Sequence, residues 1–180
     1  MGDSSAVLAT TSAGTKTFLH FINGEFVSSE SGRSFEKRRP YDGAVVGSVC
    51  EAGRDEVASA VAAARDALNG PWKTISVEDR SDTLRAIADG ITRRFDDFVE
   101  AEMADTGQPR SMMQHAFVPR GAANFKSFAD LVKSVATESF QPPTPDGAGA
   151  LNYAIRKPKG VIGVISPWNA HFLQMPWKVA

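Results

Sequence analysis

The chain has 180 residues, of which 42% are hydrophobic and 23% charged, and its formal net charge is -1. These proportions are typical of a globular protein, and because the basic residues form no cluster they argue against nucleic acid as a partner. The one cysteine, Cys50, excludes an intramolecular disulfide and favours a reducing compartment.

Residues 1–17 are polar and predict a disordered leader. They lack the apolar core of a signal peptide and the arginines of a transit peptide. No apolar run in the sequence has the length of a membrane span. We therefore expect a cytoplasmic protein that has no membrane partner.

Two short strand pairs are predicted next. In residues 18–27, FLHFINGEFV, an Asn-Gly pair lies between two apolar runs. This pattern favours a tight hairpin because both turn residues tolerate a positive φ. A second pair is predicted around residues 41–43 and 44–49.

The middle of the chain is predicted to be helical. The apolar spacing of a first helix ends at Asn69-Gly70-Pro71. Ser76 resembles the N-cap of a capping box, and the apolar stripe behind it indicates one long helix or two consecutive ones that end near residues 106–107. Another helical pattern begins after Pro109 and restarts after Pro119.

Residues 140–149, FQPPTPDGAG, contain three prolines and two glycines and are predicted to form a loop. Strand character returns in residues 151–155 and 160–165. The second run is apolar without alternation, which favours a strand covered on both faces in a parallel α/β sheet. Residues 172–180 begin a helix. Because a strand and a helix are only the first half of a βαβ unit, we expect the chain to be the front part of a larger protein.

Five segments together resemble the N-terminal part of the aldehyde dehydrogenase superfamily: FINGEF, ADTGQP, PRGAANFKSFADLVK, PKGVIGVISPWN and WKVA. Two segments are more narrowly similar to those of the 2-hydroxymuconic semialdehyde dehydrogenases and their aminomuconate-acting relatives, namely PRGAANF and PDGAGALNYAIRKPKGVIGVISPWN.

The resemblance implies an α/β fold of which this chain covers the N-terminal part. Residues 18–139 would form the helical start of the cofactor-binding domain, 140–158 a segment of a β arm that mediates oligomerisation, and 159–180 the first strand and helix start of the nucleotide-binding fold. The catalytic domain would be absent from the chain. The arm implies a homodimer or a homotetramer, which the sequence does not distinguish.

The resemblance also implies NAD-dependent oxidation of an aldehyde to a carboxylic acid. The expected substrate is 2-hydroxymuconic semialdehyde of aromatic meta-cleavage catabolism, an aldehyde that bears a carboxylate. Aminomuconate semialdehyde, another aldehyde, NADP in place of NAD, and a non-catalytic oligomerising fragment stay open as alternatives.

In this family a cysteine thiolate attacks the aldehyde and a glutamate activates water. Both lie downstream of Ala180 in the family pattern, so the chain alone is expected to be inactive. Cys50 lies in a strand-like segment that does not resemble the nucleophile motif, and a buried free cysteine usually behaves as a small hydrophobic residue.

Asn169 follows the last predicted strand and is the candidate catalytic residue, in contact with the substrate. Attack on an aldehyde turns its carbonyl oxygen into an oxyanion, which a rigid amide donor stabilises more strongly than the ground state. The alternative is an asparagine that caps the next helix. The resemblance implies the catalytic role, since ligands bind beyond the carboxyl ends of strands in open α/β sheets.

The resemblance assigns cofactor binding to Ile165, Ser166, Pro167, Trp168 and Lys178. For Trp168 the alternative is packing in a core, and for Lys178 it is an exposed position on a helix. The nearby glycines do not form the usual G-x-G-x-x-G fingerprint of dinucleotide sites, on which this family does not rely.

Arg120 is the candidate ligand for the carboxylate of the substrate, because a guanidinium group binds a carboxylate through two parallel hydrogen bonds. It follows Pro119, where a helix is predicted to begin, so the positive end of the helix dipole would assist. The alternative is a weak ion pair at the surface.

The histidines predict no metal site, because His20 and His115 lack suitably spaced ligand partners. His171 departs from the family pattern after the asparagine, as do Gln174 and Pro176. We expect Pro176 to be tolerated only in the first turn of a helix.

Overall fold

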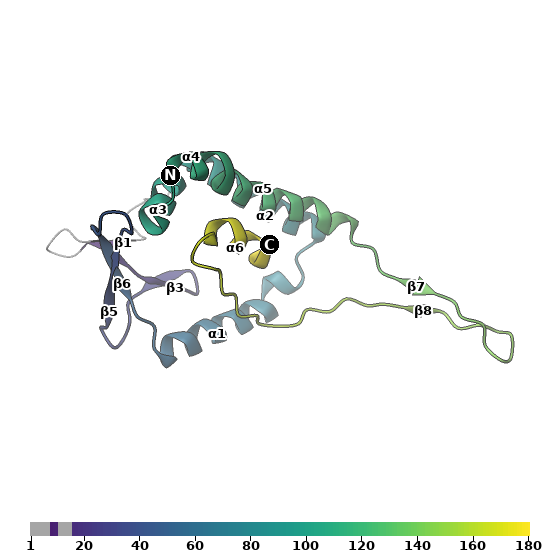
Figure 1. Cartoon of the computed structure of the whole chain (residues 1–180). Helices are drawn as coiled ribbons and strands as arrows, with labels where there is room; N and C mark the ends of the chain where they lie inside the picture. The colour runs from purple at the N-terminus through teal and green to yellow at the C-terminus, as the bar shows by residue number, and fades with distance from the viewer. Residues whose placement is uncertain (1–7, 11–15) are drawn as a thin grey trace.

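The computed structural model describes residues 8–10 and 16–180, and it combines small β-sheets with packed helices (Figure 1). This arrangement confirms the predicted α/β class. The strands are β1 Leu8–Thr10, β2 Lys16–Phe18, β3 His20–Ile22, β4 Glu25–Val27, β5 Ser34–Arg38, β6 Val45–Cys50, β7 Ser139–Phe140 and β8 Asn152–Tyr153. The helices are α1 Arg54–Asn69, η2 Pro71–Lys73, α2 Val77–Arg93, α3 Phe95–Thr106, α4 Arg110–Met112, η3 Met113–Phe117, α5 Val118–Leu131, η4 Val132–Ser134 and α6 His171–Val179.

The largest sheet has the strand order β1-β2-β6-β5, with β2 and β6 parallel and the other pairs antiparallel. The second predicted strand pair is confirmed only in part: β6 covers most of residues 44–49, but residues 41–43 lie in the connection, and the partner strand is β5, which was not predicted. Gly47 of β6 lies against the ring of Phe18, where a Cβ atom would approach Cε2 to 2.7 Å. The predicted hairpin is β3–β4, with Asn23 and Gly24 at φ values of 53° and 83°.

The disordered leader predicted for residues 1–17 falls mostly outside the described residues. The prediction is wrong for residues 8–10 and for Lys16 and Thr17, which form strands β1 and β2. Strand pairing uses backbone hydrogen bonds, which a polar segment supplies as well as an apolar one. Polarity alone was therefore not a sufficient reason to predict disorder here.

The helices α2, α3, η3 and α5 enclose the main apolar core. Its buried members are Ala88, Ile91, Val99, Met113, Val118, Ala122 and Phe125. Ser76 is the N-cap of α2, as predicted, and its side chain accepts a hydrogen bond from the backbone N–H of Asp79. Buried Ser81 donates to the carbonyl of Ala129 at 2.8 Å and ties α2 to α5. No helix among the described residues is both long and apolar enough to cross a membrane.

The helical run from Arg110 to Leu131 is continuous and does not restart at Pro119. The π-helical segment η3 joins α4 to α5, and the flanking residues Met112 and Val118 both have right-handed helical dihedrals. Pro119 directly follows this segment, and a π-helical turn lets a continuous helix accommodate the hydrogen bond that a proline cannot donate. The sequence signal at Pro119 therefore marks a π-bulge within one helix.

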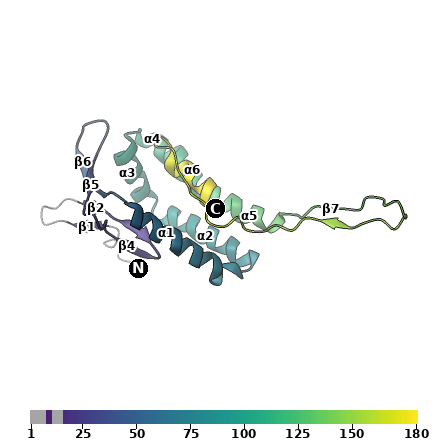
Figure 2. The ribbon, with the colours of Figure 1, turned by 90° about the horizontal axis from the view of Figure 1, so that it is seen from below.

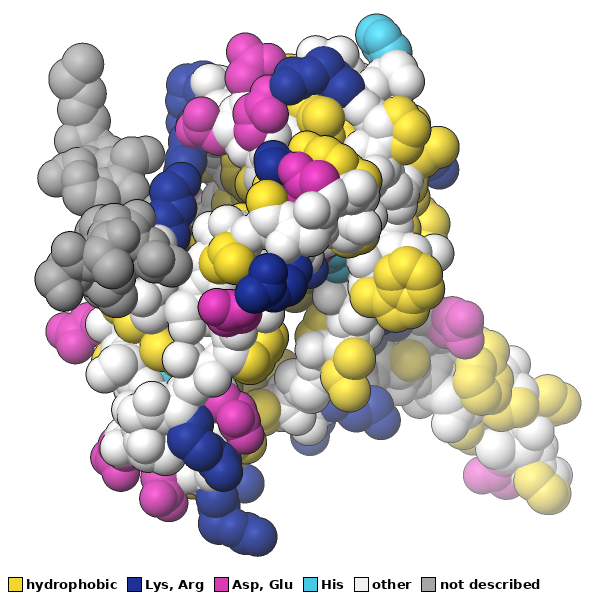
Figure 3. All heavy atoms as spheres, turned by 60° about the vertical axis from the view of Figure 1, so that its left-hand side comes forward, with side chains coloured by type: hydrophobic (Ala, Val, Ile, Leu, Met, Phe, Trp, Pro, Cys, Tyr) yellow, Lys and Arg dark blue, Asp and Glu magenta, His cyan; other side chains and the backbone are white. Residues whose placement is uncertain are grey.

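The strands β7 and β8 form a narrow ribbon that projects from the helices (Figures 1 and 2). They pair over Ser139–Phe140 and Asn152–Tyr153 only, which is shorter than the strand predicted for residues 151–155. The ribbon carries exposed apolar side chains, namely Phe140, Leu151, Tyr153 and Ile155. Figure 3 shows hydrophobic side chains on the part of the molecule that projects at the lower right.

The strand predicted for residues 160–165 is absent from the structure. This segment is extended and exposed, and Ile165 is 87% accessible to solvent. A strand needs a hydrogen-bonded neighbour, and the described residues place none beside this segment. The prediction that it is buried on both faces, as the first strand of a parallel sheet, is therefore wrong for this structure.

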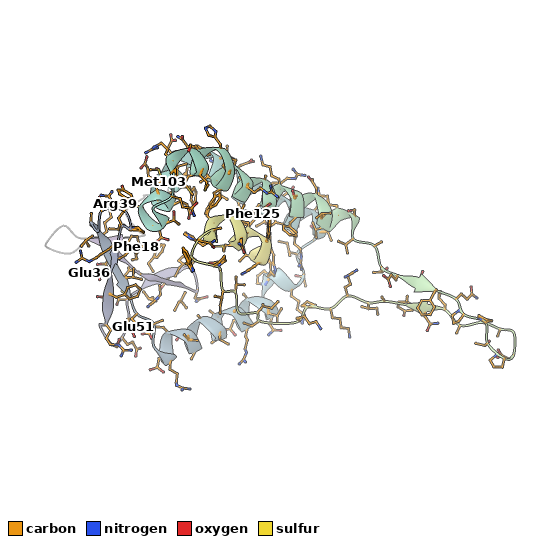
Figure 4. All side chains as sticks on the ribbon, viewed as in Figure 1. Phe18, Glu36, Arg39, Glu51, Met103 and Phe125 are labelled. Carbon is orange, nitrogen blue, oxygen red and sulfur yellow. The ribbon has the colours of Figure 1, made fainter. Side chains whose placement is uncertain are left out.

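Helix α6 covers residues 171–179, in agreement with the prediction, and packs against α3 and α5. The ring of Phe172 lies 4.8 Å from that of Phe98 on α3. Asn124 of α5 donates to the carbonyl of Leu173 at 3.2 Å, and Figure 4 shows Phe125 on the face of α5 that turns toward α6. Pro176 lies in the second turn of α6 and not in the first, so the carbonyl of Phe172 lacks its helical partner.

Candidate active site

Asn169 lies in the turn between the extended segment and α6, and a side chain from another part of the chain binds its backbone. Its carbonyl accepts a hydrogen bond of 2.6 Å from Nε2 of Gln108. Within the described part of the chain its side-chain amide makes no hydrogen bond, and the residue is exposed. The N-cap of α6 is Ala170, without a side-chain cap. The helix-capping alternative for Asn169 is thus not realised.

The position of Gln108 depends on the end of α3. Gly107 ends that helix with a left-handed φ of 71°, and its N–H donates to the carbonyl of Met103. A Cβ atom at Gly107 would also come within 3.2 Å of Pro40. Glycine adopts this conformation without steric cost. The ADTGQP segment therefore turns the chain so that Gln108 reaches the carbonyl of Asn169.

His171, two residues after Asn169, contacts two acids of α3. Its Nε2 lies 2.6 Å from Oε1 of Glu102 and 3.6 Å from Oδ2 of Asp105. Glu102 is only 5% exposed. The hydrogen bond to Glu102, followed by the attraction of both carboxylates, raises the pKa of His171 above its usual value despite the opposing effect of burial.

Arg120 borders a pocket of about 570 Å³ between α6 and the run formed by η3 and α5. The pocket is mostly apolar, and none of the described residues that line it is acidic. These residues are His115, Ala116, Phe117, Pro119, Arg120, Ala123, Leu173 and Trp177. Arg120 has no ion-pair partner among the described residues, so the predicted alternative of a surface ion pair is not realised. The pocket presents a positive charge to an anion.

The prediction that a helix dipole assists anion binding at Arg120 is wrong. Because α4 and η3 precede α5 without a break, the backbone N–H groups around Arg120 face carbonyls of the preceding turns. The N-terminal end of this helical run, where the positive end of a dipole lies, is at Arg110. Any attraction for an anion at Arg120 comes from its side chain.

Four of the five residues predicted to bind cofactor lie on the segment that leads to Asn169, and the fifth, Lys178, lies on α6. Ile165 and Trp168 are 87% and 86% exposed, while Ser166 and Pro167 are half-buried. Lys178 reaches back from α6, and its Nζ donates to the carbonyl of Ile165. The structure thus brings Lys178 and Ile165 together, and the core-packing alternative for Trp168 is not realised.

Helix α6 links the three predicted parts of the site. Asn169 precedes it, Leu173 and Trp177 on it line the pocket of Arg120, and Lys178 lies on its last turn. No hydrogen bond joins Asn169 to Arg120 among the described residues.

Sequence reasoning missed Glu102 and Gln108. Gln108 lay within a recognised segment, and the spacing of Glu102 and Asp105 by three residues places both on one helix face. The sequence carried no signal for their partners at positions 171 and 169.

Residues 26–180 match the profile described as the aldehyde dehydrogenase family. A 2-hydroxymuconic semialdehyde dehydrogenase from Pseudomonas sp. (strain CF600) is 62% identical over 164 residues, which cover 91% of this chain and 34% of that protein. A 2-aminomuconic 6-semialdehyde dehydrogenase from Pseudomonas sp. is 49% identical, over 92% of this chain and 33% of that protein.

Solved structures show the same likeness. An NAD+ complex of an aldehyde dehydrogenase from Bacillus cereus superposes with a TM-score of 0.81 at 32% identity, over 88% of this chain and 32% of that one. This chain therefore spans about a third of the length of the relatives that it matches.

Proposed function

The chain belongs to the aldehyde dehydrogenase family, and on that premise we propose that it is the N-terminal part of an NAD-dependent enzyme that oxidises 2-hydroxymuconic semialdehyde to the corresponding acid. The relative with 62% identity carries the name of that activity. In this proposal the attacking thiolate and the base that activates water come from the two thirds of the family fold that these residues do not span.

The observation that carries the substrate assignment is the charge of the pocket beside α6. Arg120 contributes a cation to a wall that is otherwise mostly apolar, and among the residues that the structure describes no carboxylate lines the pocket to neutralise it. An aldehyde with a remote carboxylate fits this arrangement, because the guanidinium group binds the carboxylate and the apolar wall contacts the carbon chain. A neutral aldehyde would leave the arginine without a partner.

Asn169 has the chemistry to stabilise the oxyanion. When a thiolate sulfur forms a bond to the aldehyde carbon, the carbonyl π electrons move to oxygen, and an amide N–H donates to the charge that develops there. The backbone of Asn169 accepts a hydrogen bond from Gln108, while its side-chain amide has no partner among the described residues and can donate. The next step expels hydride from the carbon and leaves a thioester, which water then cleaves to the acid.

The residues of the extended segment fit a nicotinamide dinucleotide, which when bound accepts the hydride. Lys178 uses one of its three ammonium N–H bonds on the carbonyl of Ile165, which leaves two to donate to ribose hydroxyl groups. Exposed Ile165 and Trp168 offer apolar surface at the same place. We assign these residues to binding and orienting the cofactor, with NADP as an alternative.

A second candidate substrate is 2-aminomuconic semialdehyde, since a relative with that printed activity is 49% identical. It also carries a carboxylate, so Arg120 suits both. NADH formation by the full-length enzyme with the hydroxy substrate, the amino substrate and a neutral aldehyde tests the assignment. We expect the highest kcat/KM for the hydroxy substrate. A preference for the neutral aldehyde contradicts the proposal.

The β7–β8 ribbon is the proposed site of assembly into a homo-oligomer. The ladder of the ribbon is short, with further backbone hydrogen bonds between its two sides only from Ala150 to Pro142 and from Ala154 to Glu138 among the described residues, and its apolar side chains are exposed. Open strand edges pair readily with another chain, so a second copy of this protein is the expected partner.

A further inference from the structure

Helix α6 is anchored to α3 at its first residue. We propose that His171 is a positioning residue for the reaction, which holds the backbone of Asn169 by binding the buried carboxylate of Glu102. The proposal rests on the oxyanion role proposed above for Asn169.

The burial of Glu102 favours a structure in which its carboxylate stays paired with His171. Glu102 is 5% exposed, and its Oε2 atom has no hydrogen-bond partner among the described residues. Its Oε1 atom contacts Nε2 of His171 at 2.6 Å. A buried carboxylate is costly unless it is paired. The imidazole supplies that partner, so the interior of the protein favours the geometry in which residue 171 stays beside α3.

Three contacts within residues 169–172 then hold the turn that carries Asn169 and the start of α6. Gln108 binds the carbonyl of Asn169, Glu102 binds the imidazole of His171, and the ring of Phe172 packs on that of Phe98. The amide of Asn169 has no hydrogen bond of its own within the described part of the chain. Its direction therefore depends on the backbone that these contacts fix.

The charges around His171 favour its protonated form. From α3, Glu102 and Asp105 face the imidazole, and Nζ of Lys37 on β5 lies 2.5 Å from Oδ1 of Asp105. On α5 the charged residue that borders α6 is Arg120, at the pocket. On α6 itself, Lys178 is engaged with the carbonyl of Ile165. A cation at the first residue of a helix opposes the helix dipole, and the two carboxylates compensate for it.

The anchor is consequently pH-dependent. The pKa of His171 is raised in the folded protein, first by its hydrogen bond to Glu102. Because the pKa is raised, the contact between His171 and Glu102 contributes fully to the stability of the folded protein below the ordinary histidine pKa of about 6.5. This stabilisation is lost as the pH rises through the folded-state pKa of His171. We expect the alignment of Asn169, and with it kcat, to decline at that alkaline limit.

The first test replaces His171 by glutamine in the full-length enzyme. His171→Gln keeps a hydrogen-bond donor for Glu102 but removes the charge. We expect kcat to fall about tenfold, well short of the loss of about 10²–10³ for a missing oxyanion donor, with KM values changed less than about twofold. The alkaline limb of the kcat profile that belongs to His171 should disappear.

The second test measures the effect of His171→Gln on kcat in an enzyme that lacks the side-chain amide of Asn169. In an Asn169→Ala background, His171→Gln should lower kcat by less than about twofold, because a positioning residue has nothing left to position. An equal loss of kcat in both backgrounds would mean a structural role and would overturn the proposal.

A milder variant keeps the proposal testable if His171→Gln does not fold. Asp105→Asn removes a carboxylate near the imidazole and should move the alkaline limb of kcat to lower pH. Asp89→Asn is the matched control, since Asp89 forms an exposed ion pair with Lys126 on other helices and should leave the limb in place. A limb that both variants leave unmoved contradicts the proposal.

The two levels of the proposal fail differently. If Asn169→Ala lowers kcat while His171→Gln changes neither kcat nor its pH profile, the positioning role of His171 is wrong and the oxyanion role stands. If Asn169→Ala leaves kcat unchanged, the oxyanion role is wrong, and the positioning role is wrong with it.

Discussion

Gln108 donates a hydrogen bond of 2.6 Å from Nε2 to the backbone carbonyl of Asn169, a residue 61 positions further along the chain. The contact joins the end of α3 to the turn that carries the candidate oxyanion donor. Because the bond uses the backbone of Asn169, it leaves the side-chain amide available for chemistry. Substitutions at Gln108 and at Asn169 can therefore separate two contributions to kcat: the position of the Asn169 backbone and the hydrogen bond that its amide donates.

Asn169→Ala in the full-length enzyme should lower kcat by about 10²–10³ with little change in KM, because the lost hydrogen bond forms mainly in the transition state. Gln108→Ala should cause a smaller loss of kcat, since it loosens the backbone and keeps the donor. Steady-state kinetics with the preferred aldehyde measure both. An Asn169→Ala enzyme with unchanged kcat refutes the assignment.

Arg120→Ala should raise the KM for a carboxylated aldehyde by about tenfold to 100-fold, as expected for a lost charge-assisted hydrogen bond. The KM for a neutral aldehyde should change little, because that substrate never used the guanidinium group. Arg120→Lys should recover part of the affinity, since a lysine keeps the charge without the planar fork. Equal losses with both substrates would show that Arg120 serves the fold and not recognition.

Lys178→Met should weaken NAD binding by about tenfold and leave the KM for the aldehyde unaltered. The reason is that the ammonium group of Lys178 contacts the carbonyl of Ile165 in the extended segment, and Lys178 is not among the residues of the pocket. Titration of the full-length enzyme with NAD measures the change. Lys126→Met is the control, because Lys126 pairs with Asp89 on the surface, and a similar loss there would contradict the assignment.

Gly121→Ala should destabilise the docking of α6. A Cβ atom at position 121 would lie 2.7 Å from Cε1 of Phe172 and 3.1 Å from its carbonyl oxygen. Such overpacking typically costs about 1–3 kcal/mol of unfolding free energy. Gly90→Ala in α2 is the matched control, because its Cβ would meet only Arg93 at 3.8 Å, and there alanine should stabilise the helix by about 0.5–1 kcal/mol. Urea unfolding of both variants compares them, and equal shifts of the two midpoints would contradict this packing.

Tyr153→Asp should lower the oligomeric state of the full-length protein, because it places a charge on the exposed apolar ribbon of β7 and β8. Tyr41→Asp changes an equally exposed tyrosine in the β5–β6 connection and should leave assembly intact. Light scattering on the separated species gives the masses. An unchanged mass for Tyr153→Asp removes the ribbon from the interface.

Local patterns determined much of the fold. Asn23-Gly24 predicted the β3–β4 turn because these residues tolerate the positive φ values that the turn has. Ser76 predicted the start of α2 because its side chain satisfies a free N–H of its own helix. Such features involve residues close in the chain, so the sequence carries them directly. The resemblance to the family, in turn, identified Asn169, Arg120 and Lys178 as candidate site residues.

Only the tertiary structure decided which distant residues meet. The run of residues 160–165 has the composition of a buried strand, yet it is exposed here because strand formation depends on a neighbour that composition does not specify. The partners of Asn169 and His171 come from α3 and the turn after it, and Trp177 completes the pocket of Arg120 from another helix. Long-range contacts are set by how helices pack in three dimensions, and periodicity along one helix shows which face is buried but not which residue lies opposite it.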